Sequence, residues 1–326
     1  MSQRRIVITT SWLSEADEPH RILEAAGFEV DYARPADLER DARSLAEALS
    51  TATGVIAGVE PFDADALARA ERLRVIARTG AGYDNVDVAA ASERNVLICS
   101  TPQVNRQAVA EFAIGSLLNL ARQIPRSNEI IRAGGWSQPS GWELRGKTLG
   151  IVGFGAIGQA VAGIAGGLGM HVLAYDPFVS AAGTELAHVT HVDLPQLLER
   201  SDAVTLHVFL SEDTRHLIDA GAIDAMKTGA VLINAARGGV VDEDALVAAL
   251  QSKKLSGAAL DTFEREPLPA SSPLRQAENL ILTPHVAGAT VEARARSGVM
   301  AAESVVQVLS GNVPVNAVNR SLVTTG

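Results

Sequence analysis

Three residues in the second half of the chain have side chains that together can bind an anion and move a proton: Arg237, Glu266 and His285. A guanidinium can hold a carboxylate with two hydrogen bonds, and an imidazole exchanges a proton near neutral pH. A neighbouring carboxylate favours the charged imidazolium. Taken singly, each has an ordinary explanation, as a solvated turn arginine, a structural histidine and a surface acid. Arg237 and His285 both follow apolar segments, which predicts that each lies at the carboxyl end of a sheet strand.

A glycine-rich segment at 153–158 has the pattern G-x-G-x-x-G, which is a candidate dinucleotide site. The first glycine permits a tight turn, the second lets backbone approach a pyrophosphate, and the third allows close packing of a helix on a strand. N–H groups at the start of the following helix can then face phosphates. Gly153, Gly155 and Gly158 are therefore predicted to contact a cofactor.

Asp176 ends the next predicted strand, 18 residues after Gly158. A carboxylate at this point can accept hydrogen bonds from both ribose hydroxyls of adenosine and repels a 2′-phosphate, which favours NAD over NADP. The alternative is a structural glycine turn followed by a capping aspartate. The order of strand, turn, helix, strand and acid favours the dinucleotide interpretation.

Alternating strands and helices are predicted to position these residues, which is typical of parallel sheets covered by helices. Strands are expected at 5–10, 28–32, 53–59, 74–78, 95–100, 148–152, 171–175, 203–208, 230–234, 257–260 and 280–283. Helices are expected at 19–26, 38–50, 64–73, 86–93, 107–123, 125–134 and 290–309. The pattern predicts an α/β chain with two successive doubly wound parallel sheets. Ligands of such sheets lie at the carboxyl ends of the strands, and the expected site is the cleft between the two domains.

The composition indicates a globular protein of two domains, with 326 residues of which 47% are hydrophobic and 20% charged. A formal net charge of −10 argues against nucleic acid as a partner, because phosphates attract basic surfaces. The single cysteine, Cys99, excludes a disulfide framework, fits a cytoplasmic location and is predicted to be a buried, inert thiol. The uncharged segment 150–175 is too rich in glycine to be read as a membrane span, so no membrane association is expected.

Taken together, the motifs of the chain resemble the D-isomer-specific 2-hydroxyacid dehydrogenase family. The resemblance covers nearly the whole chain, in the family's order. It rests on the segments 78–87, 101–111, 153–158, 234–238, 260–267 and 283–288. It implies a Rossmann cofactor domain, 101–289, inserted in a flavodoxin-like substrate domain formed by 1–100 and 290–326.

The resemblance also implies a hydride transfer between NAD and the 2-position of a small 2-hydroxy or 2-keto acid. Arg237 would hold the substrate, His285 would donate or accept the proton, and Glu266 would pair with His285. Backbone N–H groups of Ala81 and Gly82 would bind the substrate carboxylate from the other domain, with Arg78 beside them.

For the cofactor, the resemblance implies backbone contacts at Ala156 and Ile157 and a contact of Asp261 with the nicotinamide carboxamide, although Asp261 has an alternative as a strand-end cap. Further contacts are implied at His207, Thr214 and Ala235. This chain has Phe209 where family members usually have proline, which puts the shape of the adenine pocket in question. No metal ion is expected at the site.

The substrate is left open between two groups. The segments 78–82 and 314–319 and the spacing around Trp136 favour a phosphoglycerate dehydrogenase type, expected without an appended regulatory domain because the sequence ends at Gly326. The segment 137–140 lacks the basic residues that a phosphate needs, and Arg78, Arg106 and Arg132 are the only nearby candidates. Glyoxylate, hydroxypyruvate or another small keto acid is therefore an equal alternative.

Two other functions are known on the same scaffold. Formate or phosphite oxidation is disfavoured because formate dehydrogenases have glutamine where Glu266 stands. An NAD(H)-sensing, corepressor-like binding protein, similar to C-terminal-binding proteins, is disfavoured because this chain has no long unstructured tail. The family also implies a homodimer, with the apolar segment 112–121 as the expected contact.

Overall fold

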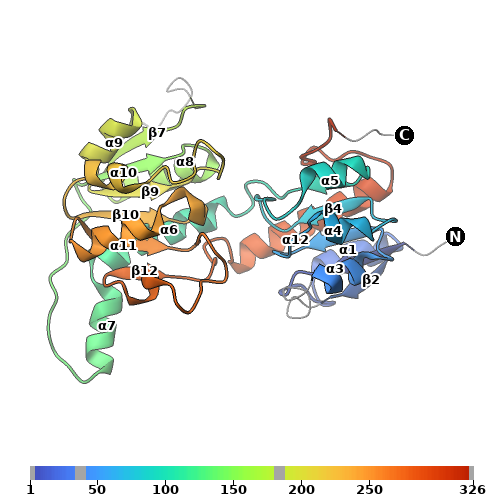
Figure 1. Ribbon diagram of the computed structural model, residues 1–326, viewed down its shortest axis with the longest axis horizontal. Coiled ribbons are helices and arrows are strands. Elements are labelled where there is room, and N and C mark those ends of the chain that lie inside the picture. Colours follow the sequence, from blue (N-terminus) through green and yellow to red (C-terminus); the bar gives the residue numbers. More distant parts are fainter. Residues whose placement is uncertain (1–3, 34–41, 180–187, 323–326) are drawn as a thin grey trace. The chain divides into compact units, whose positions relative to one another are not determined.

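The chain forms two compact units in the computed structural model, which describes residues 4–33, 42–179 and 188–322 (Figure 1). Unit 1 comprises Met1–Asn105 and Thr290–Gly326, and unit 2 comprises Arg106–Ala289. The sequence predicts changes of domain at 100/101 and 289/290. The described residues contain no helix long and apolar enough to cross a membrane.

Unit 1 is built on a parallel sheet of five strands in the order β2-β1-β3-β4-β5, the order of flavodoxin-like folds. The strands are β1 (Arg5–Ile8), β2 (Glu29–Tyr32), β3 (Gly54–Ala57), β4 (Val75–Arg78) and β5 (Leu97–Cys99). The helices are α1 (Glu18–Ala25), α3 (Ala42–Leu49), α4 (Ala64–Ala68), α5 (Val88–Glu93) and α12 (Val291–Leu309).

Both faces of this sheet are covered, so its inner strands read as continuous apolar segments rather than as alternating ones. Val55 and Ile76 face a core with α3 and α4, whereas Ile56 and Val75 face a core with α1 and α12. The C-terminal helix α12 therefore completes a unit that the first hundred residues begin. Cys99 is buried as predicted, and burial raises the pKa of its thiol to about 12.

Unit 2 is built on a parallel sheet of seven strands in the order β12-β11-β10-β9-β6-β7-β8, the Rossmann order with one more strand at the end. The strands are β6 (Thr148–Val152), β7 (His171–Tyr175), β8 (Val189–His191), β9 (Ala203–Leu206), β10 (Ala230–Asn234), β11 (Leu255–Leu260) and β12 (Leu280–Leu282). The helices are α6 (Arg106–Ala121), α7 (Ile124–Arg132), α8 (Ala156–Gly167), α9 (Leu194–Arg200), α10 (Ala220–Ala225) and α11 (Glu243–Gln251), with 3₁₀ turns η1 (Gly238–Val240) and η2 (Pro273–Gln276). Two doubly wound parallel sheets confirm the predicted fold class. The sequence does not predict strand β8, because none of its three residues is buried and they form no apolar segment.

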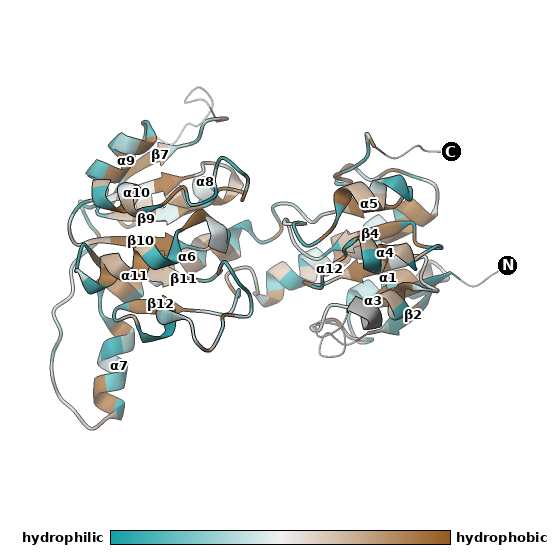
Figure 2. Cartoon of the chain, in the orientation of Figure 1, coloured by the Kyte–Doolittle hydropathy of each residue, from teal (hydrophilic) through white to brown (hydrophobic). Residues whose placement is uncertain are grey.

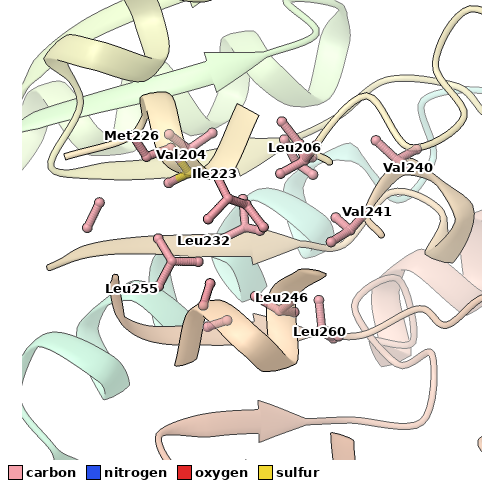
Figure 3. Close-up of a cluster of buried hydrophobic side chains, with 14 of the residues drawn as sticks. Val204, Leu206, Ile223, Met226, Leu232, Val240, Val241, Leu246, Leu255 and Leu260 are labelled. Carbon is pink, nitrogen blue, oxygen red and sulfur yellow. The ribbon is translucent and has the colours of Figure 1, made fainter. Parts of the chain in front are cut away.

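The core of unit 2 lies on both sides of β10, whose five residues are all buried. Figure 3 shows Leu232 of β10 among side chains of the flanking elements, including Val204, Ile223 and Leu246. Val231 belongs to the second core, which includes side chains of α6 and α8. These two layers fix the sheet, and the winding reverses between β6 and β9, where ligands of such sheets bind.

Helices α6 and α7 differ sharply in burial although they are neighbours in sequence. In α6, Ala113, Leu117 and Ala121 are buried and the helix packs along α8, so much of the apolar character of 112–121 serves the core of unit 2 itself. Helix α7 has no buried residue and extends away from the sheet, with polar and apolar residues side by side (Figures 1 and 2). Of these two helices, α7 is therefore the one whose apolar side chains are exposed.

Candidate active site

The glycine-rich loop between β6 and α8 leaves no room for side chains at two of its three glycines. A Cβ on Gly153, which has φ +93°, would lie 2.6 Å from the carbonyl oxygen of His207. A Cβ on Gly158 would lie 2.2 Å from the carbonyl oxygen of Gly153. The loop must therefore be glycine at both positions to bring β6, α8 and the end of β9 together.

The N-terminus of α8 is open toward a ligand. Gly155 is the N-cap and provides no side-chain hydrogen bond, and a Cβ built on it would meet nothing within 4 Å. The first N–H groups of an α-helix have no partner within the helix, so those of Ala156 and Ile157 are available to an anion. This cradle fits the pyrophosphate of a dinucleotide.

Asp176 lies directly after β7 and holds two loops together. Its Oδ2 accepts a hydrogen bond from the N–H of Phe154 at 2.7 Å, within the glycine-rich loop. Its Oδ1 accepts from the N–H groups of Phe178 at 2.8 Å and Val179 at 3.2 Å. The capping role considered for Asp176 is thus present, and a carboxylate with about four lone-pair positions retains room for a further donor.

His207 follows β9 beside the glycine-rich loop and keeps one ring nitrogen unpaired. Its Nε2 lies 3.0 Å from Oγ1 of Thr205. Its Nδ1 is buried and has no hydrogen-bond partner among the described residues. Burial lowers the pKa of His207 to about 4, so the imidazole is neutral at physiological pH. A buried polar atom without a partner at a ligand-binding edge is consistent with a contact that a bound molecule completes.

Thr214 and Ala235 occupy the two loops that follow β9 and β10. The hydroxyl of Thr214 donates to the carbonyl of Phe209 at 2.6 Å and accepts from the N–H of Ser211 at 2.7 Å, so it fixes the turn 209–214. Ala235 is half-buried directly after β10. Phe209 is 82% exposed, which places a bare aromatic side chain where the family usually has proline.

The predicted pair of His285 and Glu266 is formed. Nδ1 of His285 lies 2.8 Å from Oε2 of Glu266, and Oε1 of Glu266 accepts from the N–H of Phe263 at 3.0 Å. His285 has φ +53°, and its N–H donates to the carbonyl oxygen of Asp261 at 2.9 Å. With Nδ1 engaged by Glu266, the other nitrogen, Nε2, is the one available to a reactant.

The charge of Glu266 is set by opposing effects. Burial raises the pKa of its carboxyl, but the hydrogen bond and charge of His285, the N–H of Phe263 and the charge of Arg237 together lower the pKa below its usual 4.5. Glu266 is therefore ionised throughout the neutral range, as a partner that stabilises a charged imidazole must be.

Arg237 lies in the turn after β10, close enough for its charge to act on Glu266. The fully buried Asn234 shapes this turn by donating to the carbonyl of Arg237 at 2.8 Å and accepting from the N–H of Ala236 at 3.0 Å. A Cβ on Gly238 would lie 1.8 Å from the carbonyl carbon of Phe263. Glycine at 238 therefore lets the Arg237 turn pack against the loop that carries Glu266. Asn234 belongs to the motif segment 234–238, but the sequence assigns it no role. The only sequence feature that points to it is its position as a polar residue at the end of an apolar strand.

Asp261 is fully buried and serves the loop that carries His285. Its Oδ1 accepts from the hydroxyl of Thr283 at 2.6 Å and from the N–H of Val286 at 2.8 Å, and its Oδ2 accepts from the N–H of Ala287 at 2.7 Å. This geometry is the strand-end cap weighed as an alternative for Asp261. It leaves about one lone-pair position for a ligand.

In unit 1, the residues expected to bind substrate are Arg78, the last residue of β4, and Ala81 and Gly82 shortly after it. Arg78 is 9% exposed and donates from Nη1 to the carbonyl of Ala57 at 3.1 Å and from Nε to the carbonyl of Gly82 at 3.3 Å. The N–H groups of Ala81 and Gly82 have no hydrogen-bond partner in the described part of the chain. Arg78 therefore shapes the loop, while the two N–H groups remain available to an anion.

The burial of Asp261 generates a prediction. We expect Asp261→Ala to lower the free energy of unfolding by roughly 3 kcal/mol, because two backbone N–H groups and a hydroxyl lose a charged acceptor in the interior. Asp193→Ala, which removes an exposed N-cap of α9, should cost only about 1 kcal/mol. Urea unfolding of the two variants measures the difference, and equal losses would contradict the structural role of Asp261.

Comparison with known proteins assigns the chain to a family. Residues 114–287 match the family model described as D-isomer specific 2-hydroxyacid dehydrogenase, NAD binding domain. The D-3-phosphoglycerate dehydrogenase of Archaeoglobus fulgidus is 38% identical over 89% of this chain and 57% of its own length. The glyoxylate reductase of Korarchaeum cryptofilum is 40% identical over 81% of each chain. The (S)-sulfolactate dehydrogenase of Chromohalobacter salexigens is 44% identical over 82% of this chain and 92% of its own.

A solved structure extends the comparison to the fold. The D-lactate dehydrogenase of Aquifex aeolicus, solved with NAD and lactic acid, superposes with a TM-score of 0.83 at 28% identity and covers 94% of this chain and 96% of its own. The chain spans just over half the length of the A. fulgidus phosphoglycerate dehydrogenase and most of the length of the other relatives. The chain belongs to the D-isomer specific 2-hydroxyacid dehydrogenase family, and residues 114–287 are its NAD-binding domain.

Proposed function

We propose that this protein is an NAD-dependent dehydrogenase that transfers a hydride between nicotinamide and C2 of a small 2-hydroxy or 2-keto acid. The observation that supports it is the 2.8 Å contact between His285 and Glu266, with the charge of Arg237 acting on the same carboxylate. An anion clamp and a proton donor with its own acidic partner are what reduction of a keto acid requires.

In the reduction, His285 donates its Nε2 proton to the carbonyl oxygen of the substrate, and it takes that proton back in the oxidation. Glu266 holds Nδ1–H and stabilises the imidazolium before transfer. Arg237 binds the substrate carboxylate and polarises the carbonyl. When bound, the cofactor would supply the hydride to C2 as NADH in the reduction and would accept it as NAD⁺ in the oxidation, so that one hydride and one proton convert keto acid to hydroxy acid.

The cofactor contacts follow the geometry of unit 2. The N–H groups of Ala156 and Ile157 would hold the pyrophosphate, and Asp176 would accept from the adenosine ribose. His207, Thr214 and Ala235 line the same edge of the sheet at the ends of β9 and β10. Asp261 has one acceptor position left for the nicotinamide carboxamide, in addition to its role as a cap.

For the substrate, we favour a small keto acid without a phosphate, such as glyoxylate or hydroxypyruvate. The N–H groups of Ala81 and Gly82 bind its carboxylate. Arg78, the cation beside them in sequence, already donates to two backbone carbonyls and lies near the buried carboxyl of Glu60, which disfavours a dianionic phosphate. A glyoxylate reductase among the relatives is consistent with this preference.

We also propose a homodimer in which α7 meets a second copy of the chain. Ile124 and Ile131 of this helix are 50% and 56% exposed, whereas much of α6, the contact expected from sequence, is buried in unit 2. Closed two-fold pairs are the commonest soluble assemblies, and they bury apolar side chains of this kind.

The proton donor is tested by His285→Ala. We expect this variant to bind NADH as the wild type does but to lose turnover by roughly 10²–10⁴, the usual contribution of acid–base catalysis. Absorbance of NADH with glyoxylate, hydroxypyruvate, phosphohydroxypyruvate and sulfopyruvate measures turnover, and NADH fluorescence measures binding. The control is His171→Ala, which changes an exposed histidine at the amino end of β7.

Normal turnover in His285→Ala would refute the assignment of His285 as the proton donor. If the wild type binds NADH but turns over none of the four acids, the result would favour an NAD(H) sensor.

The cofactor preference is tested by Asp176→Ala. Removing the carboxylate should relax the preference for NADH over NADPH by about tenfold or more, because a 2′-phosphate no longer meets a negative charge at that point. Steady-state kinetics with the two cofactors measure the ratio of kcat/KM. The variant Asp176→Asn separates charge from capping, and unchanged selectivity in both would show that Asp176 does not contact the ribose.

The dimer is tested by Ile131→Glu. A charge on this exposed side chain should convert a dimer to monomer at micromolar concentration, because the interface cannot hydrate it. Light scattering coupled to gel filtration gives the mass, and Phe178→Glu, at another exposed apolar residue, is the control. A wild-type monomer, or a variant that stays dimeric, would exclude α7 as the contact.

A further inference from the structure

His216, Glu243 and Glu264 form a cluster that adjoins Glu266 in the chain through Glu264, and the cluster has no part in the proposed chemistry. Nε2 of His216 lies 2.9 Å from Oε1 of Glu264. Oε1 of Glu243, in the first turn of α11, accepts from the N–H of Glu264 at 2.7 Å. We call these three residues the 216–243–264 cluster.

The cluster ties together three segments that carry proposed site residues. The N–H of His216 donates to the carbonyl of Gly239 at 2.8 Å, in the turn after Arg237, and His216 itself follows the Thr214 turn. Glu264 is joined to His216 by its side chain and to Glu243 by its backbone. The segment that carries Glu266 is thus attached from two sides.

Glu264 is only two residues from Glu266 in the sequence. Glu264 follows Phe263, whose N–H binds Oε1 of Glu266, and Oε2 of Glu266 binds His285. A displacement of Glu264 would therefore move the N–H that fixes one oxygen of Glu266. Oε2 of Glu266, and the His285 imidazole that it contacts, would move as well.

The charges in the cluster act on one another and involve His216. Burial raises the pKa of Glu243, and the nearby charges of Glu264 and Asp244 raise it further, against the N–H of Glu264 and the charge of His216. Glu264 raises the pKa of Glu243, whereas His216, which contacts Glu264, lowers it. The side chains of His216 and Glu264 are each 40% exposed, and an ion pair this exposed contributes little to stability.

We propose that His216 is a positioning residue: through Glu264 it holds the segment 263–266 so that Glu266 meets His285 in the productive orientation. This inference rests on the proposed function, in which the dyad supplies the proton. His216 and Glu264 would act through the position of Glu266, and neither has a proposed contact with substrate or cofactor.

The test compares His216→Ala with His216→Gln. His216 has φ +50°, so both variants carry the same backbone cost and their difference reports the side chain. We expect His216→Ala to lower kcat about tenfold with NADH affinity unchanged, because small misplacements of a catalytic group are costly. We expect His216→Gln, whose amide can donate to Glu264, to recover most of the activity.

A kinetic isotope effect separates positioning from a general structural defect. If the proton donor is misplaced, the chemical step becomes slower, and the primary isotope effect on kcat with nicotinamide-deuterated NADH should rise above the wild-type value. Glu264→Ala should reproduce the loss and the isotope effect. It carries the test if His216→Ala fails to fold, which thermal unfolding reveals. The matched control is again His171→Ala, expected to leave both quantities unchanged.

The outcomes distinguish this inference from the proposed function. Wild-type kcat in His216→Ala and Glu264→Ala, together with loss of turnover in His285→Ala, would overturn the positioning role and leave the function intact. A loss that His216→Gln does not recover, or one without a larger isotope effect, would also overturn it. Full turnover in His285→Ala would remove the proposed function itself.

Discussion

The carboxyl ends of three neighbouring strands in unit 2 lie in register, and the arrangement of the candidate site depends on that constraint. Asn234 of β10 is paired with Leu260 of β11, and Leu260 is paired with Leu282 of β12. The next residues, in particular Asp261 and Thr283, therefore leave the sheet side by side. Parallel pairing thus gathers segments that are distant in sequence at one edge, before any polar contact forms.

Buried polar side chains then convert these strand ends into loops of defined shape. Asn234 closes the turn of Arg237, and Asp261 closes the turn of His285. Asp176, which is half-buried, binds the N–H of Phe154 after β7. Because buried polar groups need partners, Asn234 and Asp261 restrict their loops to few conformations. A ligand role for Asp176 or Asp261 has to coexist with this structural role.

The pair of His285 and Glu266 is partly exposed, yet hydrogen bonds orient both side chains. The side chains of His285 and Glu266 are 46% and 38% exposed, so packing alone does not fix them. Their orientation depends on the N–H of Phe263, on the backbone of His285 and on the 216–243–264 cluster. Loops of this kind supply function from the surface of a rigid sheet.

The amino-acid sequence by itself determined the fold class, most strand positions and the family motifs. The strands 148–152, 171–175 and 230–234 were predicted to the residue, because apolar segments bounded by glycine and polar residues are local signals. The same holds for the glycine-rich loop, where the turn itself requires the residue type. The pairing of His285 with Glu266 was expected only through the family resemblance.

Only the tertiary structure decided which side chains meet across loops and which charges are already engaged. It placed Arg78 against two backbone carbonyls, directed much of α6 into the core and left α7 exposed. It brought His216, Glu243 and Glu264 together from three segments, and only Glu264 lies within one of the family motifs. The physical reason is that such contacts depend on strand register and loop packing, whereas local periodicity reports only whether a residue faces the interior.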